Sequence, residues 1–160
     1  KRKRGLEMFF SYTQEEMERA LNLFHTLAKA YKNVSDHANR DSKEHGLNPT
    51  EYAVLELLYI KGPQKLQQIG SKLLLVSGNV TYVIDKLEKN GWIYREKNPK
   101  DKRSVYANLS EKGRQYFDEI YPIRALRMAR VFSGLSEEEQ VQLIELLKKA
   151  ADSSNSVLFR

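Results

Sequence analysis

The sequence contains no cysteine among its 160 residues. This absence excludes disulfide bonds, zinc sites built on thiolates and sensing by thiol oxidation. Long hydrophobic runs are also missing, since no uninterrupted apolar segment approaches the ~20 residues that a helix needs to span a bilayer. No secretory signal pattern is present either. These absences predict a cytoplasmic protein that does not associate with membranes.

Signatures of catalysis and metal binding are absent as well. The sequence shows no nucleophile elbow, no P-loop and no paired-carboxylate signature. Its three histidines, His25, His37 and His45, are widely spaced. Asp41 follows His37 by four residues and could place two metal ligands on one helical face, but surface histidines are far commoner than such sites. We therefore expect no enzyme, no cofactor and no metal site.

The composition is that of a folded, basic protein. Apolar residues make up 41% of the chain and charged residues 30%, and the formal net charge of +6 favours an anionic partner. The excess charge is concentrated, because the stretch from Trp92 to Tyr106 carries five cations and two anions. The basic start, Lys1 to Arg4, could be either an arm that contacts DNA or a solvated tail.

Apolar periodicity predicts a long first helix from about Thr13 to Lys43. Its apolar residues form a stripe, with alternating three- and four-residue spacing from Phe24 onward: Met17, Phe24, Leu27, Tyr31, Val34 and Ala38. A stripe of this length outside a compact core predicts an interface between subunits.

Several later helices have clear start signals. Asn48 followed by Pro49 and Glu51 is typical of an N-cap with a capping box, and Gly62-Pro63 ends that helix. A short helix is predicted next, from Leu66 to Leu73. Nearer the end of the chain, Ser110 is the expected N-cap of a helix from about Glu111 to Ser133, which Pro122 should kink. Ser136 is the expected N-cap of a last helix from Glu137 onward, and the apolar Val157–Phe159 tail should dock.

The segment from Ser77 to Gly91 predicts an amphipathic helix. Its apolar residues recur at i, i+3, i+4 and i+7 and predict a buried face: Val80, Val83, Ile84 and Leu87. The opposite face carries side chains that form hydrogen bonds or bear positive charge: Ser77, Asn79, Thr81, Tyr82 and Lys86. Two strands, Trp92 to Lys97 and Ser104 to Leu109, form a basic hairpin after it. A polar helix face beside a basic hairpin suits the major groove of DNA with a flanking wing.

The order of elements predicts a mainly α fold with a small β-hairpin. We interpret it as a winged helix-turn-helix with long N- and C-terminal dimerisation helices. Residues 1–46 would form an N-terminal arm and the first dimerisation helix, residues 47–112 the DNA-binding domain, and residues 113–160 the C-terminal dimerisation helices. The termini would then meet in a homodimer.

Four segments resemble the MarR (multiple antibiotic resistance regulator) family of bacterial transcription factors: Leu47–Leu55, Val80–Gly91, Asp101–Arg103 and Leu109–Gly113. The Asp-x-Arg wing followed by Leu-Ser-x-x-Gly is the more specific part, and the resemblance covers residues 14 to 152. The run from Asn48 to Asn90 is similar to regulators that respond to quinones and other aromatic compounds. Two residues depart from the family pattern, Lys65 at a usual Ser or Thr cap and Gly70 at a usual Ala.

The resemblance implies a homodimer that binds a palindromic operator in double-stranded DNA, acts as a repressor and is released by a small aromatic or phenolic effector. It implies that Arg103 enters the minor groove and that Asp101 orients it. Lys100 and Lys102 are candidate phosphate contacts or solvated side chains. The missing cysteine separates the chain from the peroxide-sensing branch of the family.

The resemblance also implies an effector pocket between the dimerisation helices and the winged domain. Aromatic candidates for its lining, which are equally candidates for core or interface positions, are Phe24, Tyr31, Tyr59, Tyr116 and Phe117. A competing interpretation is a winged helix that serves as a protein-interaction module without sequence-specific DNA binding. That module would have apolar or acidic residues on its exposed helix face and would lack a basic wing. This sequence instead has a polar helix face and a basic wing.

Overall fold

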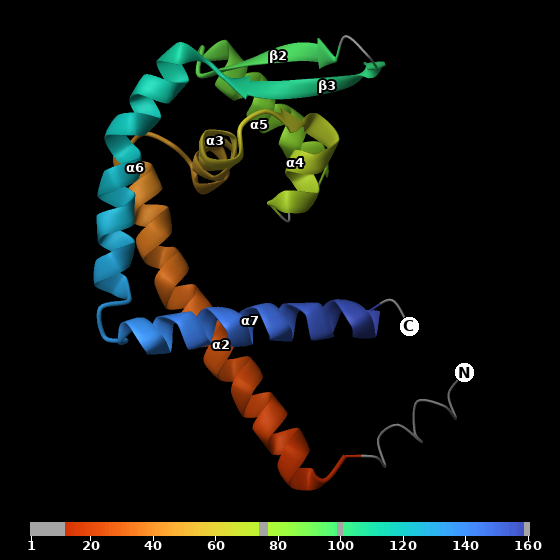
Figure 1. The fold of residues 1–160 in the computed structure, drawn as a ribbon, viewed down its shortest axis with the longest axis vertical. Helices are drawn as coiled ribbons and strands as arrows, with labels where there is room; N and C mark the ends of the chain where they lie inside the picture. The colour runs from red at the N-terminus through yellow and green to blue at the C-terminus, as the bar shows by residue number, and fades with distance from the viewer. Residues whose placement is uncertain (1–11, 74–76, 99–100, 159–160) are drawn as a thin grey trace. The chain divides into compact units, whose positions relative to one another are not determined.

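The computed structural model describes residues 12–73, 77–98 and 101–158, without the side chains of residues 77–79, 98, 101–103 and 158 (Figure 1). The basic start Lys1–Arg4 and the terminal Phe159 lie outside the described residues. The chain forms two compact units, residues 1–46 and residues 47–160. No helix within the described ranges is long and apolar enough to cross a membrane.

The first unit consists of helix α2 (Gln14–Glu44), within one residue of the predicted bounds. It starts with a capping box, because the Glu16 N–H donates to Thr13 Oγ1 (3.2 Å) and the Thr13 N–H donates to the Glu16 carboxylate (2.8 Å). The predicted apolar stripe is exposed in its first half, with 64% of Phe24 and 74% of Tyr31 accessible. Apolar side chains exposed to this extent are typical of a surface that contacts another chain.

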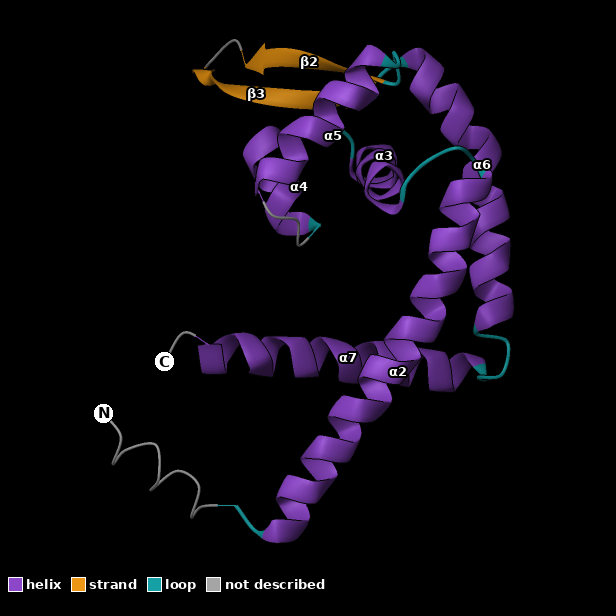
Figure 2. Cartoon of the chain, turned by 180° about the vertical axis from the view of Figure 1, so that it is seen from behind, coloured by secondary structure: helices purple, strands orange, loops and turns teal. Residues whose placement is uncertain are grey.

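The second unit contains the remaining helices and one small sheet (Figure 2). The helices are α3 (Pro49–Lys61), α4 (Leu66–Lys72), α5 (Ser77–Lys89), α6 (Glu111–Val131) and α7 (Glu137–Leu158). The strands are β1 (Gln64–Lys65), β2 (Ile93–Asn98) and β3 (Asp101–Leu109). The mainly α fold with a small sheet agrees with the prediction.

The helix boundaries follow the start and stop signals in the sequence. The Glu51 N–H donates to Asn48 Oδ1 (2.8 Å) at the start of α3, and the Gly113 N–H donates to Ser110 Oγ (2.9 Å) at the start of α6. Gly62 ends α3 in the left-handed region, at φ 70°. Helix α6 continues through Pro122 to Val131, close to the predicted end at Ser133.

The sheet has the order β1–β3–β2 with antiparallel pairing throughout. Strand β3 begins at Asp101, three residues before the predicted Ser104, because the hairpin pairing extends to the tip, where Asn98 lies opposite Asp101. Strand β1 was not predicted. Its two residues pair with Ala107 and Tyr106 of β3, and so short a strand has no alternating pattern to detect.

The core of the second unit lies between α3, α5, α6 and the sheet. The predicted buried face of α5 is confirmed, with Ile84 and Leu87 fully buried and Val80 and Val83 nearly so. The same cluster includes Leu55 and Leu58 of α3 and Phe117 of α6, among others. This core fixes which face of α5 points outward.

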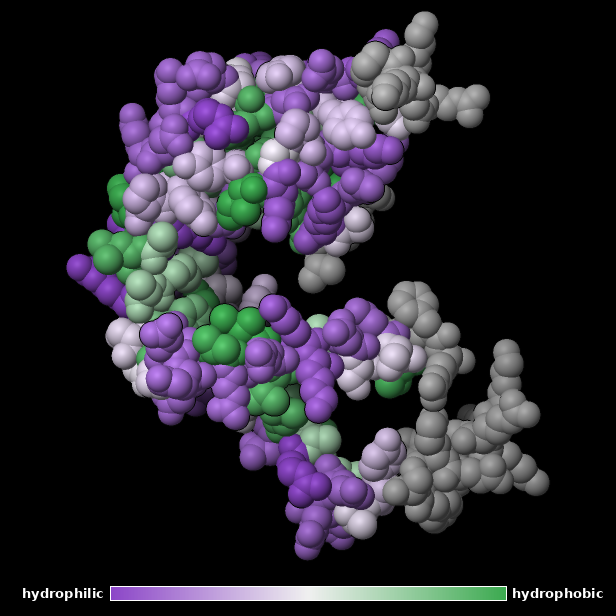
Figure 3. All heavy atoms as spheres, viewed as in Figure 1, coloured by the Kyte–Doolittle hydropathy of each residue, from purple (hydrophilic) through white to green (hydrophobic). Residues whose placement is uncertain are grey.

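Helix α7 extends into the apolar end of the chain. Val157 lies within the helix and is 71% exposed in the single chain, so docking of the apolar tail stays a prediction for the dimer. The helix also exposes an apolar stripe: Val141, Ile144 and Leu147. Figure 3 shows hydrophobic surface where α7 lies.

Candidate nucleic-acid interface

Helix α5 presents the polar face that the sequence predicts for DNA contact. Thr81 and Tyr82 are both exposed, Tyr82 to 67%, whereas the next two residues, Val83 and Ile84, are buried. The side chains of Ser77 and Asn79, at the start of α5, lie outside the described residues. The predicted contacts of α5 that the structure places on an accessible surface are therefore Thr81, Tyr82 and Lys86, whose side chain is 45% exposed.

Lys86 lies on the same helix but is held by another part of the protein. Its ammonium forms an ion pair with the carboxylate of Glu51 in α3, a residue only 2% exposed. The hydrogen bond and the negative charge of Glu51 raise the pKa of Lys86 above its ordinary value. Lys86 is thus charged at any physiological pH, and its charge already has a partner inside the protein.

Arg95 of β2 is likewise engaged with carboxylates, in this case from α5. Its backbone N–H and its Nη1 donate to the Glu88 carboxylate (3.1 and 2.8 Å), and its Nη2 pairs with Asp85. Arg95 counts among the five cations of the basic stretch, yet its charge is neutralised by these two carboxylates. No local pattern indicates this pairing, because the partners lie seven and ten positions away on another element.

The tip of the hairpin carries the remaining predicted contacts. Asp101, Lys102 and Arg103 are the first three residues of β3, and Lys100 comes just before that strand. The described strands place these residues where β2 and β3 meet at the turn. Their side chains, and all of Lys100, lie outside the described residues.

The aromatic candidates for an effector pocket separate into different environments. In α2, Phe24 and Tyr31 are exposed. In the second unit, the fully buried Phe117 ring lies 5.1 Å from the ring of Tyr59, whereas Tyr116 stacks on Trp92 at 5.2 Å. The structure therefore brings Tyr59 and Phe117 together and directs Tyr116 to a separate contact.

Tyr59 also forms a side-chain hydrogen bond with α6. Its hydroxyl donates to Asp118 Oδ1 over 2.7 Å, and this hydrogen bond raises the pKa of Tyr59. Two further rings that the sequence did not single out join the cluster, Tyr52 and Tyr121, at 5.1 Å from Phe117 and 5.3 Å from Tyr59. The cluster packs α3 against α6.

A cavity that the sequence did not indicate lies beside the exposed face of α5. Its volume is about 300 Å³, and its lining comes from α4, α5 and β2: Leu66, Gln67, Gly70, Ser71, Val80, Thr81, Ile84 and Arg95. Apolar walls with a few polar groups are typical of small-molecule sites. Because Thr81 belongs to both the cavity and the polar face, an occupant would lie next to the candidate DNA surface.

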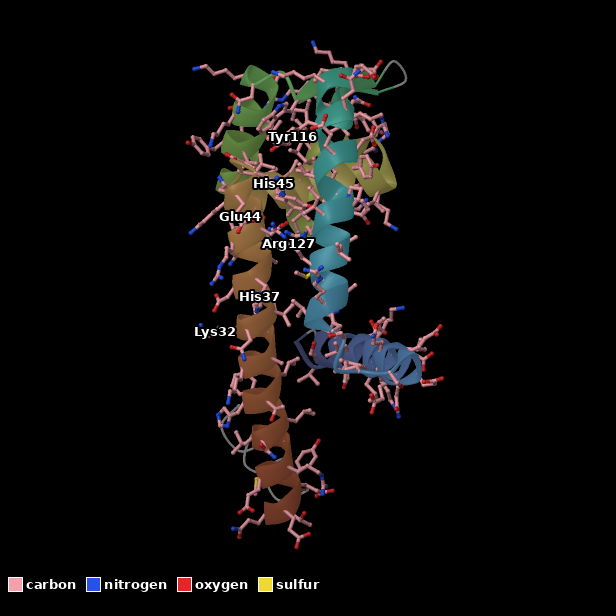
Figure 4. All side chains as sticks on the ribbon, turned by 90° about the vertical axis from the view of Figure 1, so that its left-hand side faces the viewer. Lys32, His37, Glu44, His45, Tyr116 and Arg127 are labelled. Atoms are coloured by element: carbon pink, nitrogen blue, oxygen red, sulfur yellow. The ribbon has the colours of Figure 1, made fainter. Side chains whose placement is uncertain are left out.

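The described residues hold no group of three or more side chains that could bind a metal ion. Figure 4 shows His37 on α2 well separated from His45, which follows the end of that helix, with Tyr116 and Arg127 on α6. Asp41 is paired with His45, whose Nε2 lies 3.8 Å from Asp41 Oδ1. The structure thus gives Asp41 a different histidine partner from the one considered on the sequence.

Comparison with known proteins identifies the family. The model of the MarR family matches residues 47–105. The HTH-type transcriptional regulator YkoM of Bacillus subtilis is 69% identical over 153 residues, which cover 96% of this chain and 99% of that protein.

Two solved structures share the fold. A MarR family transcriptional regulator from Streptomyces coelicolor, in complex with DNA, is 24% identical with a TM-score of 0.75, covering 89% of each chain. NadR in complex with 4-hydroxyphenylacetate is 21% identical with a TM-score of 0.71, covering 79% of this chain and 89% of NadR. The family match, the close relative and the shared fold agree, and the chain belongs to the MarR family of DNA-binding transcriptional regulators.

Proposed function

We propose that this regulator is a homodimeric repressor that binds a palindromic operator through α5 and the hairpin of β2 and β3. The observation that carries the proposal is the exposed polar face of α5, with Thr81 and Tyr82 outward and Val83 and Ile84 buried. A helix held in this way beside a hairpin matches major-groove reading with a wing. The Streptomyces coelicolor protein that shares the fold was solved in complex with DNA. A regulator of this kind works on the chromosome, in the bacterial cytoplasm.

DNA binding and dimerisation would be carried out by different parts of the chain. Residues 47–112 would bind DNA, and residues 1–46 and 113–160 would hold the two subunits together. Support comes from the apolar residues that α2 and α7 expose, such as Phe24 and Ile144. A soluble monomer rarely leaves apolar patches of this extent uncovered. Two subunits would place two copies of α5 about one turn (~34 Å) apart on the duplex.

Release from the operator would follow reversible binding of a small aromatic or phenolic compound. Thiol oxidation is excluded because the sequence has no cysteine. NadR, which shares the fold, was solved with the phenol 4-hydroxyphenylacetate. One candidate site is the cavity of about 300 Å³ that Thr81 and Arg95 help to line. The second candidate lies at the aromatic cluster of α3 and α6 to which Tyr59 and Phe117 belong.

The test of DNA recognition is selection of bound fragments from a random duplex library at near-physiological salt. The proposal expects enrichment of one inverted repeat, and affinity that falls steeply as salt rises, since each neutralised phosphate releases counterions. Arg103→Ala should weaken binding to that repeat by about 1–3 kcal/mol without changing the unfolding transition. Failure to enrich any sequence would favour the protein-interaction module instead, and unchanged affinity in Arg103→Ala would remove this residue from the interface.

A further inference from the structure

The buried carboxylate of Glu51 connects the start of α3 to the exposed side of α5. One of its oxygens accepts the Asn48 N–H over 3.0 Å and completes the capping box, and the other pairs with the Lys86 ammonium. Glu51 is 2% exposed, so its charge requires compensation from inside the protein. The Asn48 N–H and the Lys86 ammonium together provide that compensation.

The Glu51–Lys86 ion pair is one brace of α5, meaning an ion pair that ties this helix to a neighbouring element. A second brace holds α5 on another side. Arg95 of β2 reaches Asp85 and Glu88, which flank Lys86 on α5. Successive helix residues point about 100° apart, so Asp85 and Lys86 leave α5 in different directions. Through these pairs α5 is tied to α3 on one side and to β2 on the other.

Resting on the proposed DNA-binding function, we propose that Glu51, Lys86 and Arg95 are positioning residues that fix the orientation of α5. Lys86 is then not a phosphate contact, although the sequence placed it on the DNA-reading face. Thr81 and Tyr82 lie within the five residues before Lys86, so a rotation or tilt of α5 would move them relative to base edges. The braces therefore act on sequence discrimination rather than on general attraction to DNA.

The salt dependence of binding distinguishes a lysine that contacts a DNA phosphate from one that only positions α5 through an ion pair within the protein. A lysine that neutralises a phosphate releases counterions, and its removal lowers the slope of log affinity against log salt by about 0.9. A lysine already paired with a buried carboxylate makes no such contribution. Lys86→Gln should therefore leave the slope unchanged and reduce affinity for the selected repeat about 3–10-fold, with little change on a permuted duplex of the same composition. A slope reduced by about one would overturn the proposal.

Glu51→Gln separates the brace from the cap, because the amide oxygen can still accept the Asn48 N–H while the carboxylate charge is lost. The proposal expects the same selective loss of affinity for the repeat as in Lys86→Gln. The double variant should be no worse than either single variant, since both remove one pair. Additive losses would show that Lys86 acts independently of Glu51 and would contradict the proposal.

Lys89→Gln is the matched control, because Lys89 is an exposed cation on the same helix. Its effect should add to that of Glu51→Gln. Thermal unfolding of each variant establishes that the comparison is made on folded protein. If the wild-type protein selects no sequence, the proposed function fails, and the salt slope of Lys86→Gln measured on the permuted duplex still decides whether Lys86 contacts phosphate.

Discussion

Gly113 shows why the Leu-Ser-x-x-Gly motif ends in glycine. A Cβ at this position would lie 2.0 Å from the carbonyl oxygen of Trp92, which is backbone and has little freedom to move. Ser110, three residues earlier, accepts the Gly113 N–H and also donates to the Gly91 carbonyl (2.7 Å). The start of α6 is thereby fixed against the segment that leads from α5 into β2, and the motif is a packing requirement.

Gly113→Ala should destabilise the protein by about 1–3 kcal/mol, because the added methyl group forces backbone apart in a packed region. The measurement is the midpoint of urea unfolding. Gly134→Ala is the control, since nothing lies within 4 Å of a Cβ placed there. Equal midpoints for the two variants would show that the close approach to Trp92 relaxes at no cost.

At the scale of elements, the start of α2 should depend on pH. The hydrogen bond from the Thr13 backbone N–H lowers the pKa of Glu16 below its ordinary value. The contribution of this capping box is therefore present above the unfolded pKa of Glu16 and is lost as pH falls through the lowered value. NMR titration should show a Glu16 carboxyl midpoint below the ordinary glutamate value. Thr13→Ala keeps the backbone N–H but loses the hydroxyl that also donates to Glu16, so it should raise that midpoint part of the way. A Glu16 midpoint at the ordinary value would mean that the box does not form in solution.

The same elements show what a sequence can and cannot reveal. Local signals suffice for the capped starts at Asn48 and Ser110 and for the buried face of α5, because each depends on residues within one or two turns. The pairing of Lys86 with Glu51 joins residues 35 positions apart, and nothing in their local sequence encodes it. Surface polarity alone cannot distinguish a lysine that faces DNA from one that a neighbouring helix has already paired.

At the scale of the whole molecule, the exposed stripe on α7 should be required for assembly. Ile144 is 52% exposed in the single chain. Ile144→Glu would bury a charge in an apolar interface, so the variant should shift to monomers of 18.6 kDa in sedimentation and lose affinity for the inverted repeat. Gln142→Glu adds the same charge at an exposed polar position of α7 and should remain dimeric. A wild-type protein that sediments as a folded monomer at micromolar concentration would contradict the dimer.

The proposed control by a phenolic ligand also belongs to this scale, because it would act on the two DNA-binding units of the dimer together. A phenol releases the operator only if it binds the DNA-incompetent state more tightly than the competent one. A preference of about 1.4 kcal/mol gives a tenfold loss of operator affinity, and linkage requires operator DNA to weaken phenol binding by the same factor. Titration of salicylate-like phenols and quinols, with and without the selected repeat, should show this reciprocal factor. Phenols that bind equally in both titrations, or that do not bind, would leave a DNA-binding dimer without this form of control.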